Sequence, residues 1–312
     1  MTATGIDLSD INLVYDHDKN VHRNDIGQDY LIDLLDGIDT EESFREAVYA
    51  YRDGDKDPNG AYLSDETYSE GEELGIMIAE QGIAKDKILD QVDGNGFRDG
   101  FPTFLQDSID AGATSYIVSA GDEDFLQAFY REHGFNPDHE SLHINGTKQQ
   151  WEDGKAAGII NGCGREKKPE RYFTNAAATY ITRERDGNHP MDPLVVSGDS
   201  SGDSHLMHYA RKNGGLAIAT GEDAADHADI VVQADSWYGQ IAATLGYAGL
   251  HNGMTRDEII QEGRDYLQQY DIEDDIHIQP AAHGDRTISL NGKHHDISIG
   301  ETVADLAEAM LE

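Results

Sequence analysis

The sequence predicts an α/β protein built on a doubly wound parallel sheet, with an inserted helical segment and a C-terminal ββα extension. Two observations support this fold class. Short apolar runs of strand length alternate with helical segments through the second half of the chain. A long segment with the residue spacing of helices also separates the first apolar run from the others. Repeated strand–helix alternation with right-handed crossovers gives a parallel sheet covered by helices.

The predicted core comprises residues 1–22 and 112–250. Residues 11–15 and 114–118 are apolar runs that indicate its first two strands. A helix is expected over residues 123–133, because Asp122 is a suitable N-cap and Gly134 can end the helix. The alternation continues with strands over 194–197, 216–219 and 230–232 and a helix over 204–212.

The predicted helical cap covers residues 23–111, between the first two strands of the core. Its helical segments are residues 30–35, 42–51, 74–81 and 104–109, and links rich in glycine and aspartate join them. This segment is therefore expected to be a helical insertion.

The predicted C-terminal extension covers residues 251–312. Two strands, 287–290 and 295–299, flank Asn291-Gly292, a dipeptide favoured in tight hairpin turns. Thr302 and Asp305 are expected to cap a last helix that ends near Leu311. We expect this ββα unit to dock on the core.

The chain is strongly acidic. Among its 312 residues, 61 are acidic and 23 are basic, which gives a formal net charge of −38. We expect no nucleic-acid partner, because proteins that bind nucleic acids neutralise phosphates with lysine and arginine. The acidic residues are spread along the whole chain, which predicts a halophilic protein. At about 1 M salt the Debye length is about 3 Å, so the self-repulsion of such a surface is largely screened.

The sequence gives no membrane or targeting signal. No window approaches the roughly 18 apolar residues that a membrane span requires, and the N-terminus lacks a basic region followed by an apolar stretch. We therefore expect a cytoplasmic protein without a membrane partner. The lone Cys163 excludes an intramolecular disulfide and any CxxC metal or redox motif.

Acidic or hydroxylated residues directly follow three of the predicted strands. Asp16 and Asp18 come after the first strand, Ser119 after the second, and Asp199 and Asp203 after the strand 194–197. In an open parallel sheet the carboxyl ends of the strands meet at one crevice. The three clusters therefore predict a single site.

This set of residues suits the hydrolysis of a phosphate monoester through a covalent intermediate. Such a reaction needs a nucleophile, an acid for the leaving oxygen and positive charge around the phosphoryl group. Asp16 would attack phosphorus, while Asp18 would protonate the leaving group and later activate water. Mg²⁺ would offset the repulsion between carboxylate and phosphate, with Asp199 as a ligand and Asp203 as a ligand or outer-shell partner.

The same reaction needs groups that hold the phosphoryl oxygens. Ser119 and the backbone N–H groups of Ala120 and Gly121 are candidates at the start of a helix. Lys168 is the preferred cation, and the adjoining Lys167 is the alternate.

The order DxD, strand-end Ser, Lys and GDSxxD resembles the haloacid dehalogenase superfamily of aspartate-nucleophile phosphatases. The runs Ile117-Val-Ser-Ala-Gly and Gly198-Asp-Ser-Ser-Gly-Asp-Ser-His-Leu-Met are similar to its phosphoserine-phosphatase-like branch. The resemblance covers about residues 10–245. It implies a Rossmann-like core and the following roles: nucleophile Asp16, acid/base Asp18, phosphate ligands Ser119 and Lys168, and metal ligands Asp16, the Asp18 backbone oxygen and Asp199.

The resemblance also implies a role for the insertion. The family places a helical cap between its first two motifs, and such a cap closes over the site, excludes water and selects the substrate. A cap of this size favours a small phosphomonoester over a phosphoprotein.

A second metal signal lies in the predicted cap. Asp55, Asp57, Asn59 and Glu66 fit the ligand positions of a twelve-residue EF-hand calcium loop, with Gly60 at its sharp turn. Pro58 opposes this interpretation, because it biases Asp57 away from helical geometry. No equally good partner loop accompanies the motif. Ca²⁺ binding here remains an alternative.

The sequence therefore predicts a Mg²⁺-dependent phosphatase that hydrolyses a small phosphomonoester through an aspartyl-phosphate on Asp16. One alternative is a phosphotransferase that uses the same site to pass the phosphoryl group to an alcohol. Another is a calcium-binding or interaction protein with a catalytically idle core. Water or an added acceptor taking the phosphate separates the two enzymatic hypotheses, whereas tight Ca²⁺ binding without turnover would favour the third.

Overall fold

The computed structural model describes residues 5–25, 30–36, 38, 43, 70–92, 96–163, 194–273, 275–282, 286–290 and 293–312. Several predicted features lie outside these residues. They are the calcium loop with Asp55, Asp57, Asn59 and Glu66, the cations Lys167 and Lys168, the turn Asn291-Gly292, and all but residue 43 of the helix expected over 42–51.

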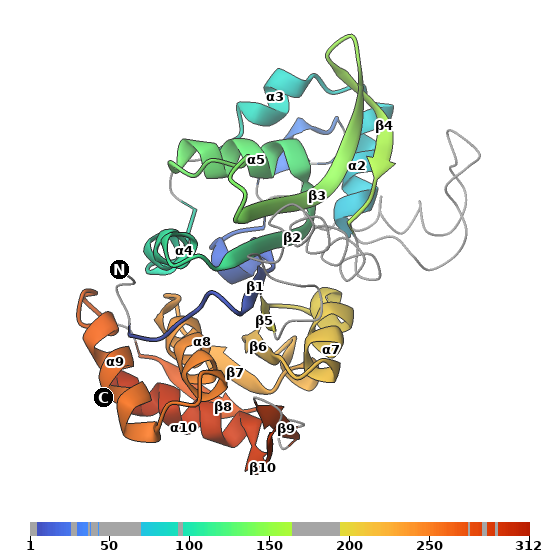
Figure 1. Cartoon of the computed structure of the whole chain (residues 1–312). Helices are drawn as coiled ribbons and strands as arrows, with labels where there is room; N and C mark the ends of the chain where they lie inside the picture. The colour runs from blue at the N-terminus through green and yellow to red at the C-terminus, as the bar shows by residue number, and fades with distance from the viewer. Residues whose placement is uncertain are drawn as a thin grey trace.

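An eight-stranded sheet forms the centre of the molecule (Figure 1). Its spatial order is β4 (Lys155–Asn161), β3 (Leu142–Glu152), β2 (Thr114–Asp122), β1 (Asn12–Tyr15), β5 (Leu194–Gly198), β6 (Leu216–Thr220), β7 (Ile230–Gln233) and β8 (His277–Pro280). The strands from β3 to β7 pair in parallel, while β4 and β8 are antiparallel edges. The predicted α/β fold with a doubly wound parallel sheet is confirmed.

The strand order reverses at β1. The chain continues from β1 to β2 and β3 on one side, and then returns to place β5, β6 and β7 on the other side. The crevice at such a reversal, outside the carboxyl ends of the strands, is where open α/β sheets bind ligands. Asp16 and Asp199 directly follow β1 and β5, the two strands that flank this point.

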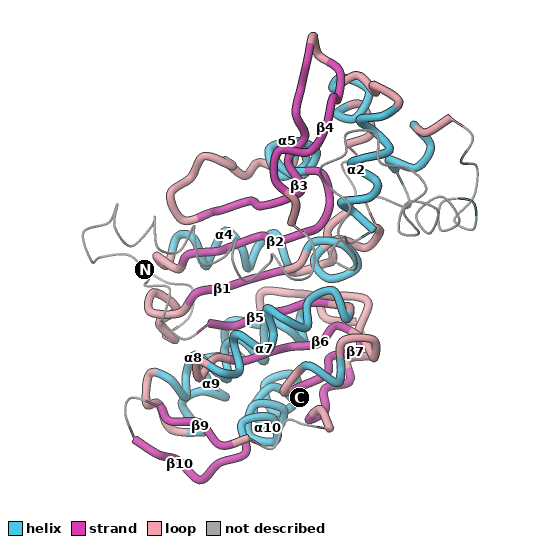
Figure 2. Tube along the Cα trace, turned by 90° about the vertical axis from the view of Figure 1, so that its right-hand side faces the viewer, coloured by secondary structure: helices cyan, strands magenta, loops and turns pink. Residues whose placement is uncertain are grey.

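The sheet has an apolar core on each face, and this explains the continuous apolar runs in its strands. Leu13 and Tyr15 of β1 belong to the larger core, whereas Val14 belongs to the smaller one. Helix α7 (Ser204–Lys212) covers the smaller core through Leu206 and Met207. Figure 2 shows α7 and α8 near β5 and β6.

The larger core is covered by several helices. They are α4 (Phe101–Asp110), α5 (Glu123–Glu132), α8 (Tyr238–His251), α9 (Arg256–Leu267) and α10 (Ile299–Leu311). Asp122 caps α5 as predicted, since its side chain accepts a hydrogen bond of 2.8 Å from the N–H of Phe125. None of the described helices is both long and apolar enough to cross a membrane.

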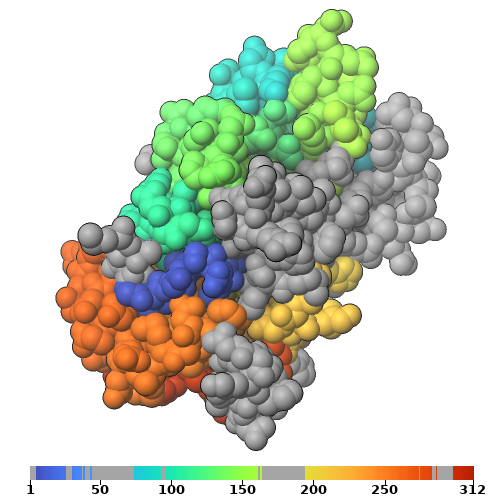
Figure 3. Space-filling view, viewed as in Figure 1, coloured from blue at the N-terminus to red at the C-terminus, as the bar shows by residue number. Residues whose placement is uncertain are grey.

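The described part of the insertion contains α2 (Glu70–Glu80), α3 (Lys85–Leu89) and the short turn η3 (Ile32–Leu34) before α4. Helix α2 packs against β4 and β2. Helix α4 lies on the core, because Phe104 contacts the rings of Trp237 and Tyr266. In the space-filling view, α3, α5 and the β3–β4 hairpin lie at the upper end of the molecule, and the orange surface that includes α9 lies at the lower left (Figure 3).

The C-terminal unit consists of the antiparallel pair β9 (Thr287–Leu290) and β10 (Lys293–Ser298), followed by α10. Thr302 and Asp305 do not cap this helix, contrary to the prediction. The helix begins at Ile299, and the Ser298 hydroxyl accepts a hydrogen bond of 3.4 Å from the N–H of Glu301. Ser298 provides a cap directly after the strand, so the helix starts earlier than expected. Helix α10 then packs on α8 and α9.

Candidate active site

The chain makes a tight turn after β1, and this turn presents the first two predicted site residues. The backbone N–H of Asp16 donates to the carbonyl of Ser197 at 2.9 Å, which ties the start of the turn to β5. Asp16 is 6% exposed. Three residues later Lys19 adopts a left-handed conformation with φ of +53°, which is uncommon for a residue with a side chain. The turn η1 (His17–Val21) therefore contains non-helical backbone at Asp18 and Lys19, just after the carboxyl end of β1.

Three carboxylates converge at the carboxyl ends of β1 and β5. Oxygen atoms of Asp16, Asp199 and Asp203 all lie within 4.8 Å of one another. No second group of this kind occurs among the residues described. Three like charges so close together repel one another unless a cation or protons intervene. A purely oxygen donor set suits a hard divalent cation such as Mg²⁺, so the residues present fit the predicted ion.

Asp203 also shapes the loop that carries Asp199. Its Oδ2 accepts hydrogen bonds from the N–H groups of Asp199 at 3.2 Å and Ser200 at 3.4 Å. Asp203 is 1% exposed, and a Cβ on Gly198 would lie only 2.4 Å from its Oδ2. The glycine at 198 is therefore needed for the close approach of this carboxylate. Asp203 is both a member of the acidic cluster and the group that holds the β5 loop.

Ser119 meets Asp18 across the crevice. The Ser119 hydroxyl, which is fully buried, donates to Asp18 Oδ2 at 3.3 Å and accepts from the N–H of Gly121 at 3.0 Å. Ala120 and Gly121 still belong to β2, and α5 begins at Glu123, after its cap. The N–H of Gly121 thus points at Ser119, and these residues precede the helix rather than open it.

A buried polar network behind the acidic cluster was not found from the sequence. The Asn20 amide donates to the carbonyls of Asp16 at 3.0 Å and Ser197 at 2.9 Å. Its oxygen accepts from the hydroxyls of Ser197 at 2.8 Å and Thr220 at 2.7 Å. Gln240 of α8 donates to Thr220 at 3.1 Å. Polar residues at the ends of apolar strands were the only available signal for this network.

Electrostatics at the turn follow from the acidic cluster. Burial would lower the pKa of Lys19, but the charges of Asp25, Asp199 and Asp18 together raise it. The Lys19 ammonium pairs with Asp25 at 3.2 Å. The Lys19 side chain beside the cluster therefore keeps its proton and its positive charge.

Two buried residues at this turn, His17 and Tyr130, are kept neutral. Burial, followed by the charges of His22 and His133, holds the pKa of His17 well below its usual value. Its Nδ1 lies 3.3 Å from the hydroxyl of Tyr130. Burial chiefly, with Tyr15, Asp16 and Asp18 adding to it, raises the pKa of Tyr130. The buried rings of His17 and Tyr130 therefore carry no charge next to the acidic cluster.

The structure thus brings five predicted residues together at the carboxyl end of the parallel strands. Asp16, Asp199 and Asp203 form the acidic cluster, and Asp18 with Ser119 forms an adjoining pair. The roles assigned to them from the sequence stay predictions, as does the choice between Lys167 and Lys168.

Comparison with known proteins yields similarity of structure. No model of a protein family matches the chain, and no curated protein matches it. A gene product of Archaeoglobus fulgidus is similar over 96% of this chain and 95% of its own, with a TM-score of 0.59 and 14% identity. An apo phosphoserine phosphatase is similar over 71% of this chain and 92% of its own, with a TM-score of 0.48 and 14% identity.

A third solved structure is a HAD family hydrolase from Salmonella enterica. It is similar over 69% of this chain and 65% of its own, with a TM-score of 0.47 and 16% identity. At such low identity these similarities concern the fold alone. The similarity to the Archaeoglobus fulgidus structure extends over nearly the whole chain and supports its α/β fold.

Proposed function

We propose that the chain is a Mg²⁺-dependent phosphatase that hydrolyses a small phosphomonoester through an aspartyl-phosphate on Asp16. The observation that carries this proposal is the convergence of the Asp16, Asp199 and Asp203 carboxylates within 4.8 Å, beside the contact between Asp18 and Ser119. These residues come from β1, β2 and β5, so the fold itself creates the site. A structural role would not require gathering three like charges.

The first half of the reaction transfers the phosphoryl group to the protein. A carboxylate oxygen of Asp16 attacks phosphorus while the bond to the leaving oxygen breaks. Asp18 gives its proton to that oxygen, which leaves as an alcohol. Bound Mg²⁺ supplies positive charge that offsets the repulsion between the carboxylate and the phosphate. Ser119 and Lys168 are proposed to hold the phosphoryl oxygens.

The second half restores the protein. Asp18, now ionised, takes a proton from a water molecule whose oxygen attacks the phosphorus of the aspartyl-phosphate. The bond between phosphorus and the Asp16 oxygen breaks, and inorganic phosphate leaves. Asp18 is then protonated again and Asp16 is free. A second carboxylate near the nucleophile is needed for this step, which favours a site that completes turnover over one that stops at the aspartyl-phosphate.

The test is phosphate release from a panel of small phosphomonoesters, with Mg²⁺ and at high salt, which also addresses the proposed halophilic character. We expect Asp16→Asn to lower the rate by at least about 1,000-fold, because the nucleophile is lost. Asp99→Asn is a suitable control, since Asp99 is exposed and pairs with Arg23 outside the cluster. Equal rates in the wild type and Asp16→Asn would refute the assignment.

A second measurement detects the intermediate. Brief reaction with a ³²P-labelled substrate, followed by acid quenching, should leave label on the wild-type protein and none on Asp16→Asn. Adding an alcohol acceptor during turnover distinguishes hydrolysis from phosphoryl transfer. Free phosphate is the expected product in both the presence and the absence of the acceptor.

A further inference from the structure

Arg98 connects the turn that carries Asp18 to a loop on the other side of the crevice. Its Nη2 donates to the carbonyl of Lys19 at 2.8 Å. Its Nη1 donates to the carbonyls of Ala234 at 2.8 Å and Asp235 at 3.2 Å, in the loop between β7 and α8. One planar guanidinium therefore joins two segments more than two hundred residues apart in sequence, with a geometry that a lysine cannot reproduce.

The segment that carries Arg98 is itself fixed against the same turn. Residues 96–98 pair with residues 21–23, through the N–H of Arg98 to the carbonyl of Val21 at 2.9 Å and the N–H of Arg23 to the carbonyl of Gly96 at 2.7 Å. The bridge between His22 and Phe97 lies between these bonds. The N–H of Trp237 also donates to the carbonyl of Asp99 at 2.9 Å. Arg98 is thus a rigid attachment at the end of the insertion.

The turn needs such support because Lys19 is in the left-handed region. A residue with a side chain in this region costs about 1 kcal/mol or more, and persists only where its surroundings fix it. The N–H of Lys19 donates to the carbonyl of Asn24 at 3.1 Å, while its carbonyl accepts from Arg98. Both peptide groups of Lys19 are therefore held, and Asp18 directly precedes this fixed point.

We propose that Arg98 is a positioning residue for Asp18, which it holds in the geometry needed to protonate the leaving group. The inference rests on the proposed phosphatase function. Arg98 does not touch the acidic cluster through any of the three hydrogen bonds given above, and acts through the backbone of Lys19. Asp18 then has two constraints: Lys19 fixes its backbone, and Ser119 contacts its carboxylate at 3.3 Å.

The test uses two esters that differ in their need for a proton. Para-nitrophenyl phosphate has a leaving group that departs without protonation, whereas glycerol phosphate has an alkoxide leaving group that requires an acid. We expect Arg98→Met to lower kcat/KM for glycerol phosphate by about 10- to 100-fold, and for para-nitrophenyl phosphate by less than about threefold. Arg98→Lys should give an intermediate loss, because a single ammonium cannot span both loops.

Arg23→Met is the matched control. Arg23 lies on the segment that pairs with residues 96–98, but its guanidinium contacts the exposed Asp99 and the carbonyl of Phe97. This variant should leave both kcat/KM values within about twofold of the wild type, since surface ion pairs contribute little. Hydrogen exchange at the Lys19 amide gives a readout independent of activity and metal. It should accelerate in Arg98→Met and remain unchanged in Arg23→Met.

The outcomes separate this inference from the proposed function. An equal loss for both esters in Arg98→Met, or no loss, overturns the positioning role, as does an unchanged exchange rate at Lys19. A wild type that hydrolyses neither ester nor any other in the panel overturns the phosphatase proposal, and with it the link between Arg98 and proton transfer. A selective loss for glycerol phosphate supports the inference.

Discussion

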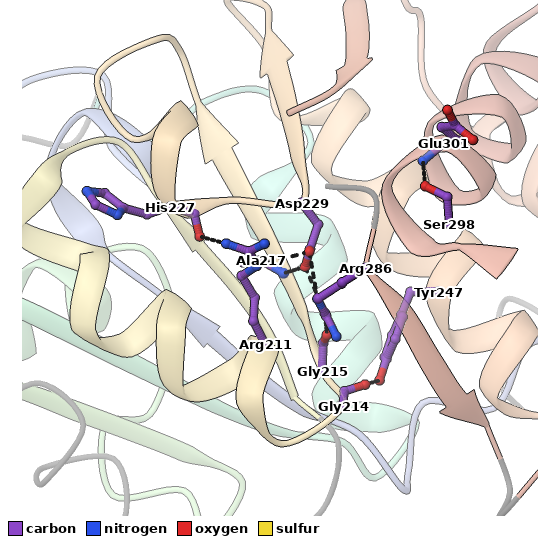
Figure 4. A network of polar contacts seen from close by, with 10 residues as sticks. All are labelled: Arg211, Gly214, Gly215, Ala217, His227, Asp229, Tyr247, Arg286, Ser298 and Glu301. Atoms are coloured by element: carbon purple, nitrogen blue, oxygen red, sulfur yellow. Dashed lines mark hydrogen bonds and ion pairs between the residues drawn. The ribbon is translucent and has the colours of Figure 1, made fainter. Parts of the chain in front are cut away.

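The carboxylates at the two ends of the parallel sheet have opposite surroundings. At the carboxyl end, Asp16, Asp199 and Asp203 are gathered within 4.8 Å of one another. At the amino end, Asp229 directly precedes β7 and is fully buried between two arginines (Figure 4). The first arrangement concentrates like charge, and the second neutralises it.

The environment of Asp229 satisfies both of its oxygen atoms. Its Oδ1 pairs with Arg286 at 2.7 Å and Arg211 at 3.1 Å, and its Oδ2 accepts from Arg286 at 2.8 Å and from the N–H of Ala217 at 3.0 Å. Arg286 also donates to the carbonyl of Gly215. Since Arg286 leads into β9, this ion pair attaches the C-terminal unit to the sheet.

The difference teaches how to distinguish a structural carboxylate from a functional one in this chain. A structural carboxylate such as Asp229 is paired with counter-charges in the fold, and these offset the cost of removing its charge from water. The acidic cluster gathers like charge, and under the proposed function a bound cation would offset that charge. Removing a charge should therefore have opposite effects on stability at the two ends.

The largest effect is expected from Asp229→Asn. Breaking a buried pair leaves uncompensated charge on Arg211 and Arg286, and costs about 3–5 kcal/mol. For a domain of this size the melting temperature should fall by roughly 10 °C. Asp305→Asn is the control, because Asp305 pairs with Arg256 at 2.9 Å while both side chains are more than half exposed. Its loss should be below about 1 kcal/mol, and equal melting temperatures for the two variants would contradict the comparison.

Much of this arrangement follows from sequence, because buried parallel strands give continuous apolar runs. Strands β1, β2, β5, β6 and β7 were predicted within a few residues of their observed bounds, and α7 matches its predicted range. Their order along the chain, combined with the polar residues after each strand, was enough to predict that Asp16 and Asp199 meet.

Other features of the fold have no recognisable pattern in the local sequence. Helix α8 lacks a polar face, since nearly all of its residues are buried, so its sequence gives no amphipathic period. In β3 the buried Gln149 donates to the carbonyl of Gly75 at 3.1 Å, a partner 74 residues away. Asn20 is similar, because its partners Ser197 and Thr220 lie 177 and 200 residues along the chain. Burial of a polar side chain depends on such distant partners, which composition and spacing do not reveal.

Asp122, the last residue of β2, is an intermediate case: it is buried, and no residue that the structure describes forms an ion pair with its carboxyl group. A second prediction concerns how this residue makes stability depend on pH. Burial raises the pKa of Asp122 to about 7, although the N–H of Phe125 opposes the shift. Between pH of about 4 and about 7 the folded protein holds a proton that the unfolded chain has released. The free energy of unfolding therefore falls as pH rises through this window, by about 2–4 kcal/mol from this group.

Asp122→Asn should remove that part of the pH dependence. Asparagine can still accept the hydrogen bond from Phe125, so the helix cap is kept. Denaturant unfolding between pH of about 4 and about 8 measures the slope, and Asp138→Asn, at an exposed position, matches the change in net charge. An unaltered slope in Asp122→Asn would show that this carboxyl stays ionised throughout.

A third prediction tests whether the acidic cluster receives a cation. Mg²⁺ should stabilise the wild type, by about 2.7 kcal/mol when its concentration is a hundred times Kd. Asp199→Asn should weaken this response because it removes one of the three converging carboxylates. Asp229→Asn should retain the response despite its lower starting stability. Mg²⁺ titration followed by thermal unfolding, at constant ionic strength, gives both values.

The smallest effect concerns the cluster without divalent cations. In a chelator, Asp199→Asn should stabilise the protein by about 1 kcal/mol, because it relieves repulsion between carboxylates within 4.8 Å. Raising the salt concentration should reduce this gain, since ions screen the remaining exposed charge. Asp229→Asn should be destabilising at every salt concentration. A loss of stability in Asp199→Asn under these conditions would mean that Asp199 is held by counter-charges in the fold, and the contrast between the two ends of the sheet would disappear.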